Sequence, residues 1–185
     1  MSPMSNNEAD GLLQDAFGRL LTAAIADIKR HVATLRESET AFYGYAALPP
    51  DYLTEFQPCR LNATFNREAD IDESRRDPYY RYSVDEWNNY IHDEFDATNT
   101  ELRALLSKFE ELGEKPESSG EKANFIASVN QTIFDALISL RNDGTFVGVS
   151  YIVIWIPDSD DEIVNRSVRE LCAANVYSEY ASEFS

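Results

Sequence analysis

The sequence offers few side chains that could do chemistry, and most of them are carboxylates. Its 185 residues include 33 aspartates and glutamates but only two histidines and two cysteines. His92 stands beside Asp93 and six residues after Glu86, so these three groups could act as acid and base. The chain has no phosphate-binding glycine loop and no G-x-S-x-G or H-E-x-x-H motif, and no nucleophile stands at a diagnostic spacing from His92. We therefore expect no catalytic site and no cofactor, and keep a carboxylate- or metal-dependent enzyme as the alternative.

The remaining reactive residues favour structural roles. His31 lies near the end of a predicted helix, where a protonated imidazole would suit the helix dipole, and we expect it to be structural or solvent-facing. Cys59 and Cys172 are far apart and belong to no metal-binding spacing, so both are expected to be reduced packing residues. The run Asp158–Glu162 resembles a calcium loop but lacks its glycine and its final glutamate. An acid-rich helix N-terminus explains that run more simply, and no metal site is predicted.

Negative charge is concentrated in two stretches of the chain. The formal net charge is −17 and the sequence pI is about 4.4, which opposes direct binding to nucleic acid. Residues 83–120 hold ten acidic and three basic residues, and residues 158–185 hold seven and two. A local negative field attracts a basic partner, so we predict a module that binds a basic protein, such as a toxin or nuclease domain. The acidic residues predicted to contact it are Asp93, Glu94, Glu101, Glu110, Glu111, Glu114, Asp160, Asp161 and Glu162. A soluble scaffold with no catalytic role remains a further alternative.

One segment combines arginine with aromatic residues. Residues 75–87 contain three arginines and four aromatic side chains, the residue types that dominate interface hot spots. A recognition patch there would add Tyr79 and Arg81 to the predicted contacts. We favour a structural interpretation, in which the arginines pair with nearby acids and the other aromatic residues close the core. Those residues are Tyr80, Tyr82 and Trp87.

The first half of the chain predicts a helix, two strands and a second helix. Apolar residues recur at steps of three and four over residues 11–36, as on one face of a helix. Residues 41–48 and 60–66 read as paired strands. The sequence from Ser83 to Glu86 is typical of a capping box, which predicts a helix from there to about residue 112, with a kink or break near Asn99.

The second half predicts a helix, a strand and a helix. A helix is expected over residues 121–142, with Gly144 as its C-terminal stop. Residues 145–156 are β-branched and apolar on both alternating faces, which predicts a central strand. A last helix follows, capped by Asp158 or Ser159.

These elements indicate one α+β domain over residues 9–185 after a tail of residues 1–8. The predicted order is α-β-β-α-α-β-α, with a small, mostly antiparallel sheet of about three or more strands covered by helices. No run reaches the roughly 18 apolar residues of a membrane span, and no secretory signal is present, so we expect a cytoplasmic protein with no membrane contact.

Three short motifs carry a resemblance to a known family. They are Phe42–Ala46, residues 62–68 and Tyr80–Trp87, in that order. In this pattern the chain resembles domain of unknown function 4303, a family of small bacterial proteins, over roughly residues 10–175. The resemblance implies a bacterial cytosolic single domain and supplies no catalytic residues. Families of this size and type often sit beside secreted toxins as immunity proteins, an analogy that makes immunity the most specific form of the predicted binding function.

Overall fold

The protein folds into a four-stranded sheet with helices on both faces and along one edge. The computed structural model describes residues 6–38, 41–50, 59–71, 77–91, 93–111, 119–159 and 161–184. Its main helices are α1 (Asn6–Glu37), α2 (Pro78–Tyr82), α3 (Asp96–Glu111), α4 (Ser119–Asn142), α5 (Glu162–Leu171) and α6 (Ala174–Phe184). Its strands are β1 (Gly44–Leu48), β2 (Asn62–Asn66), β3 (Asn89–Ile91) and β4 (Tyr151–Ile154). No helix among these described residues is long and apolar enough to cross a membrane.

The sheet is mixed, with the strand order β3-β2-β1-β4. β1 pairs antiparallel with β2, with Tyr45 opposite Phe65, and β2 pairs antiparallel with β3. β4 runs parallel to β1, with Gly44 opposite Tyr151. The predicted α+β fold with a mostly antiparallel sheet is therefore confirmed, and the predicted element order matches roughly.

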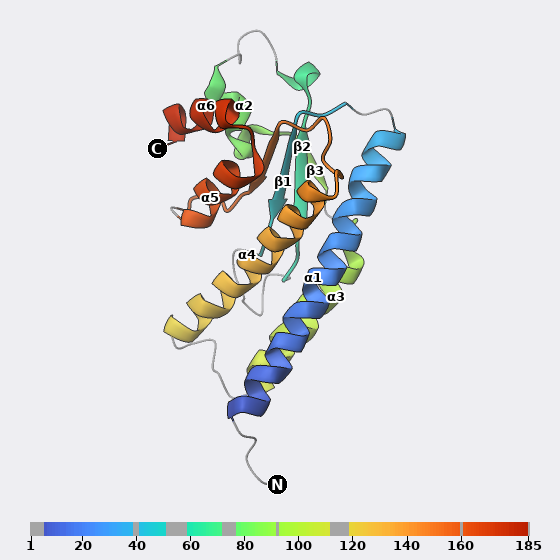
Figure 1. Ribbon diagram of the computed structural model, residues 1–185, viewed down its shortest axis with the longest axis vertical. Coiled ribbons are helices and arrows are strands. Elements are labelled where there is room, and N and C mark those ends of the chain that lie inside the picture. Colours follow the sequence, from blue (N-terminus) through green and yellow to red (C-terminus); the bar gives the residue numbers. More distant parts are fainter. Residues whose placement is uncertain are drawn as a thin grey trace.

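One face of the sheet packs against long helices through phenylalanine and aliphatic side chains. Figure 1 shows α1 and α4 crossing in front of the sheet, with α3 behind α1. Tyr45 of β1 lies between His31 of α1 and Phe146, with ring centroids 5.6 and 5.3 Å away. Farther along these helices, Phe125 of α4 contacts Phe109 of α3, at a centroid distance of 4.3 Å. This layer is a conventional apolar core, because large apolar surfaces are removed from water with few polar atoms.

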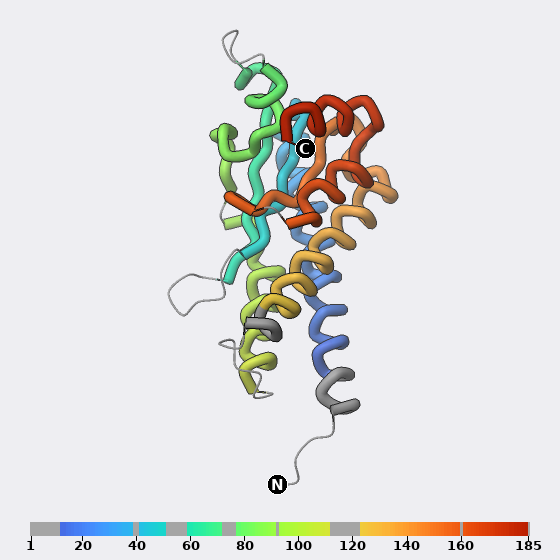
Figure 2. The backbone as a smooth tube through the Cα atoms, turned by 90° about the vertical axis from the view of Figure 1, so that its left-hand side faces the viewer, coloured from blue at the N-terminus to red at the C-terminus, as the bar shows by residue number. Residues whose placement is uncertain are grey.

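The opposite face carries tyrosine and tryptophan. Alternate residues of β4 point to this side, where Tyr151 contacts Tyr82 of α2, Trp87 and Tyr180 of α6 at centroid distances of 4.9, 5.9 and 6.2 Å. A Cβ atom on Gly44 would lie 2.6 Å from Cη2 of Trp87, so only glycine allows the indole to lie this close to the strand. α2 and α6 lie together over this face in Figures 1 and 2.

β4 is an edge strand, which corrects the prediction that it lies centrally. Its side chains are nevertheless buried because α5 packs along its free edge. The outward backbone N–H of Ile154 donates to Oγ of Ser167 at 3.0 Å, and that of Ile152 donates to Sγ of Cys172 at 3.3 Å. Side chains from α5 and its C-terminus thus replace the backbone partners that a fifth strand would provide.

The segment before β4 forms a turn where a strand was predicted. α4 ends at Asn142, and Gly144 adopts the left-handed conformation with φ of +84°, as expected for a C-terminal stop. The N–H of Thr145 donates to the carbonyl of Leu140 at 3.0 Å, which is the long hydrogen bond of a Schellman motif. The predicted strand over residues 145–156 is therefore shortened to four residues.

The helix predicted to begin at Ser83 is also corrected. Ser83 precedes a 3-10 turn, η3 (Val84–Glu86), and its side chain makes no capping hydrogen bond. The chain then forms β3, and α3 begins only at Asp96. The cap of α3 comes from α1, where Oδ2 of the fully buried Asp27 accepts from the N–H and Oγ1 of Thr98, at 2.8 and 2.9 Å. The N-terminus of α3 is thus capped by a side chain of another helix, a distant contact that local sequence patterns do not reveal.

The last predicted helix is two helices. Asp161, one of the predicted contact residues, is the N-cap of α5, since its carboxylate accepts from the N–H of Ile163 at 3.0 Å. Asp158 and Ser159, the predicted caps, lie in the preceding loop. The helix ends at Leu171 because Cys172 turns toward β4, and α6 then begins at Ala174.

Candidate binding pocket

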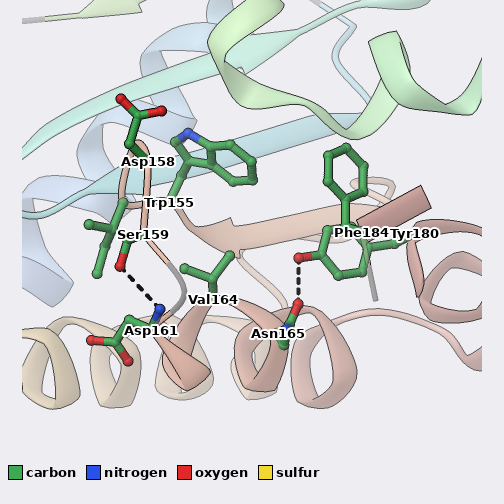
Figure 3. Close-up of a pocket in the computed structure, with 9 residues that line it drawn as sticks. Trp155, Asp158, Ser159, Asp161, Val164, Asn165, Tyr180 and Phe184 are labelled. Carbon is green, nitrogen blue, oxygen red and sulfur yellow. Dashed lines mark hydrogen bonds between the residues drawn. The ribbon is translucent and has the colours of Figure 1, made fainter. Parts of the chain in front are cut away.

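A pocket of about 280 Å³ lies where the loop after β4 meets α5 and α6 (Figure 3). Trp155, Asp158 and Ser159 line it from the loop side, and Tyr180 and Phe184 line it from α6. The N-terminal part of α5 lies between them and contributes Asp161, Val164 and Asn165. The pocket therefore joins the end of the sheet to the two C-terminal helices.

Trp155, Tyr180 and Phe184 form an aromatic wall, which is held in place by hydrogen bonds from the polar atoms of its rings. Nε1 of Trp155 donates to Oδ1 of Asp85 in η3 at 2.9 Å. The hydroxyl of Tyr180 donates to Oδ1 of Asn165 at 2.6 Å. Burial raises the pKa of Tyr180 to about 12, so its hydroxyl is a neutral donor at physiological pH. Phe184 stacks on Tyr180 at 5.0 Å and meets Trp155 edge to face at 6.4 Å. The rings are thus oriented before any ligand arrives.

Two carboxylates lie on the loop side of the pocket, and they differ in what they already bind. Asp161 caps α5, and its own N–H donates to Oγ of Ser159 at 3.1 Å. Asp158 adopts a positive φ of 51°, which aspartate tolerates better than most residues. Within the described part of the chain, its carboxylate makes no hydrogen bond or ion pair. The uncommitted carboxylate of Asp158 therefore lies beside the indole of Trp155 (Figure 3).

The composition of the lining favours a cationic group. Among the described residues, those that line the pocket include two carboxylates and no lysine, arginine or histidine. Aromatic rings also attract cations through their negative faces. The volume is slightly below the range of about 300–1,000 Å³ that is common for small-molecule sites. The pocket is therefore suited to one positively charged side chain rather than to a large substrate.

Some of the predicted contact residues gather around this pocket. Asp161 lines it, and Glu162 is exposed in the next position of α5. Tyr79 of α2 is 42% exposed and stacks on Phe184 at 5.7 Å, so an aromatic surface continues from the pocket to α2. Asp160 lies outside the described residues. Tyr79 is far from Asp161 and Glu162 in the sequence, and α6 connects them through Phe184.

Arg81 takes the structural role that we favoured. Its guanidinium lies over the ring of Tyr43 at 4.1 Å and forms an ion pair with Glu68. That pairing raises the pKa of Arg81 and lowers that of Glu68. Tyr82 and Trp87 are buried, and Tyr80 is half-buried, as the structural interpretation predicts. Arg81 is thus committed within the fold and is not among the described residues that line the pocket.

The other predicted acidic contacts form a separate surface. They lie along and just before α3, which is on the far side of α4 from α5 and α6 in Figure 1. The exposed members are Asp93, Glu110 and Glu111, whereas Glu94 is half-buried and Glu101 pairs with Arg19 at 3.1 Å. Glu114 lies outside the described residues. The described acidic residues along α3 and those at the start of α5 therefore do not meet at one site.

In the described part of the chain, the hollow beside α3 differs in kind from this pocket. A wide hollow of about 660 Å³ lies beside Glu101 on the outer side of α1. Small and polar residues of α1, such as Gly18 and Thr22, line it, and no aromatic residue contributes to its wall. Its shape gives a ligand little surface to contact.

The alternative acid and base residues are not brought together where the structure describes them. Glu86 is half-buried in η3 and lines a hollow of about 10 Å³, to which Asp93 does not contribute. His92 lies outside the described residues. No group of three or more potential metal ligands is found among the residues that are described.

His31 is a core residue, and the solvent-facing, protonated alternative is wrong. It is 1% exposed, and burial lowers its pKa to about 4, so the imidazole is neutral at pH 7. Nδ1 lies 3.0 Å from the hydroxyl of Tyr45. Both cysteines are free, as predicted, and burial raises their pKa to about 11.

Comparison with known proteins adds one decisive match. The family model described as Domain of unknown function (DUF4303) matches residues 20–173. The chain belongs to this family. The matched region includes the loop and α5 side of the pocket and ends before Tyr180 and Phe184. No curated protein and no solved structure matches the chain.

Sequence reasoning missed the aromatic wall of the pocket. Trp155 was placed in a strand, and no role was assigned to Tyr180 or Phe184. A signal was present, because Tyr180 and Phe184 are four residues apart and must share one face of a helix. Asp158 was predicted only as part of an acid-rich run and as a helix cap, with no role in binding. What the sequence could not reveal is that α6 folds back over the loop after β4.

Proposed function

We propose that this DUF4303 protein is an acidic protein-binding module that engages a basic partner through the surface around its pocket. The most specific form of this proposal is an immunity-type protein that neutralises a basic toxin or nuclease domain. The observation that carries it is the pocket itself, in which an unpaired carboxylate adjoins preoriented aromatic rings. The proposal sets this interaction in the cytoplasm, in keeping with two free cysteines.

Electrostatics and surface composition support the same face. Asp158, Asp161 and Glu162 provide negative charge at one end of α5, and such local charge increases the association rate of a basic protein. Tyr79 and Phe184 extend the contact area with aromatic side chains, which are enriched at the centres of interfaces. The surface therefore combines long-range attraction with a compact contact area.

The decisive experiment measures binding to a basic protein as a function of salt. The first candidate partner is the product of the gene adjacent to the one that encodes this chain. Calorimetric titration at 25 and 300 mM NaCl should show affinity falling by about tenfold or more, because salt screens charges on both surfaces. Equal affinity at both salt concentrations would remove the electrostatic basis of the proposal.

Two matched charge-reversal variants test which face of the protein binds the partner. Glu162→Lys lies at the pocket end of α5, and Glu110→Lys makes the same change on the separate α3 surface. We expect the first variant to lower affinity by about fivefold or more and the second to change it less than twofold. A larger effect of Glu110→Lys would move the contact to α3 and contradict the choice of face.

A further inference from the structure

We propose that the pocket receives the guanidinium group of one arginine side chain of the partner. This inference rests on the proposed binding function and specifies its central contact. It identifies the ligand chemistry from the volume of the pocket, from its one uncommitted carboxylate and from its aromatic wall.

The dimensions of the pocket restrict the ligand to a single small group. A partly open space of about 280 Å³ lies between the loop after β4 and α6, with Val164 of α5 between the two sides (Figure 3). A cofactor or a sugar chain needs more room, whereas the end of one long side chain needs less. A partner can insert such a side chain while the rest of its surface lies against the exposed ring of Tyr79.

The charge in the pocket is available to a ligand at Asp158. Asp161 already satisfies the N-terminus of α5, so its carboxylate is partly used within the fold. The carboxylate of Asp158 caps no helix in the described structure, and it lies on the same side of the pocket as Trp155. A cation placed there would gain an ion pair without displacing any existing contact of Asp158.

The aromatic wall favours guanidinium over ammonium. A guanidinium is planar, stacks on aromatic rings and can donate two parallel hydrogen bonds to a carboxylate, whereas an ammonium is compact and strongly hydrated. Trp155 and Tyr180 are fixed by hydrogen bonds to Asp85 and Asn165, so binding costs little ordering of the rings. The same combination of a guanidinium, an aromatic ring and a carboxylate occurs elsewhere in this protein, where Arg81 lies over Tyr43 and pairs with Glu68.

The test is an NMR titration of the whole chain with blocked amino acids. The probes are acetyl-arginine amide, acetyl-lysine amide and acetyl-citrulline amide, which replaces the guanidinium by a neutral urea of similar shape. Trp155 and Trp87 are the two tryptophans of the chain, and the buried indole N–H of Trp87 serves as an internal control. We expect the arginine probe to shift the indole N–H of Trp155 and the backbone amides of residues 161–165, and to leave Trp87 unchanged.

Two variants make the titration specific. Asp158→Asn removes the charge and keeps a residue that readily adopts a positive φ, so the loop is expected to retain its conformation. It should weaken arginine binding by about twofold to fivefold, the range of an exposed ion pair. Asp93→Asn makes the same charge change on the α3 side and should leave binding unchanged. Equal shifts with arginine and citrulline, or an unaltered affinity in Asp158→Asn, would overturn the inference. Lysine binding as tight as arginine would overturn the assignment to guanidinium.

The outcome can be separated from that of the proposed function. If a basic partner binds with strong salt dependence but the arginine probe does not enter the pocket, the inference fails and the binding function stands. If the probe binds as expected but the adjacent gene product shows no salt-dependent binding, the arginine pocket stands and that partner is rejected.

Discussion

The two faces of the sheet use aromatic residues in different ways. Toward α1 and α4 the rings are mainly phenylalanine, such as Phe65, Phe146 and Phe125. The buried polar ring atoms of this layer belong to Tyr45 and His31, whose hydroxyl and Nδ1 lie 3.0 Å apart. Toward α2 and α6 the rings are mainly tyrosine and tryptophan, and most of their hydroxyl and indole groups bind other elements. Tyr82, for example, donates to Oε2 of Glu179 at 2.6 Å, whereas Nε1 of Trp87 is buried without a partner in the described structure.

We call the layer toward α1 and α4 the supporting layer and the layer toward α2 and α6, which carries the pocket, the presenting layer. The phenylalanine layer gains stability mainly from apolar burial, and its few polar groups are deeply enclosed. In the tyrosine and tryptophan layer, the rings carry polar atoms: those of Trp155 and Tyr180 form hydrogen bonds beside the pocket, whereas the hydroxyl of Tyr151 bonds to a carbonyl inside the core. Damage to the first layer should therefore reduce stability most, and damage to the second should alter binding at a smaller cost in stability.

The largest effect is expected from Asp27→Ala in the supporting layer. The change would leave the N–H and Oγ1 of Thr98 buried without an acceptor and would remove the cap of α3. We expect the free energy of unfolding to fall by about 3 kcal/mol, measured by urea denaturation. Asp15→Ala, at an exposed position of the same helix, is the control and should change it by less than about 0.5 kcal/mol. If the free energy of unfolding fell by less than about 1 kcal/mol in Asp27→Ala, this layer would tolerate buried polar groups without partners.

The buried His31 predicts a stability that decreases in mild acid. Its pKa is about 4 in the fold and about 6.5 when unfolded, so the unfolded state binds the proton more readily. This contribution is complete above pH 6.5 and is lost as the pH falls from 6.5 to 4. Between pH 7 and pH 5, His31 should account for a loss of about 2 kcal/mol. Urea denaturation of the wild type and of His31→Leu at both pH values measures it, and an equal pH dependence in the two proteins would contradict the prediction.

Gly44→Ala tests the core of the presenting layer. The new methyl group would meet the buried ring of Trp87, which Tyr43 and Tyr151 hold in place. Overpacking of this kind costs about 2 kcal/mol in the free energy of unfolding. Gly18→Ala is the matched control, since its Cβ has open space and helix propensity should add up to about 1 kcal/mol of stability. Thermal unfolding of both variants should show shifts of opposite sign.

The smallest effect on stability is expected from Tyr180→Phe. It removes one hydrogen bond to the exposed Asn165 and keeps the ring, so the free energy of unfolding should fall by only about 0.5 kcal/mol. Because the ring loses its anchor beside the pocket, binding of the arginine probe should nevertheless weaken. If stability fell by more than about 2 kcal/mol, α6 would belong to the supporting layer.

Local patterns in the sequence were enough to predict the two long helices of the supporting layer, α1 and α4. The helix expected at 11–36 is found at Asn6–Glu37, and that expected at 121–142 is found at Ser119–Asn142. Gly144 ends α4 as expected. In these elements the apolar repeat and the end signals agree with the tertiary packing, so local information suffices.

The presenting layer could not be predicted in the same way, because distant contacts override its local signals. The apolar repeat that includes Trp87 and Ile91 continues in step into α3, yet Trp87 packs on Gly44 and Ile91 pairs with Ala63. Because β4 has apolar residues on both faces, the sequence indicates that both faces are covered. It does not reveal that α5 covers the free edge of the strand. Acidic residues are concentrated in two stretches of the sequence. Their role in binding stays a prediction.

The way α5 closes the edge of β4 has a consequence for the integrity of the chain. A protein shortened to end at Pro157 would keep all four strands but would expose the N–H groups of Ile152 and Ile154 to solvent. Such an open edge is a template on which strands of other molecules can assemble. The C-terminal helices are thus also a safeguard against self-association, and loss of this region through proteolysis or early termination would yield an aggregating product.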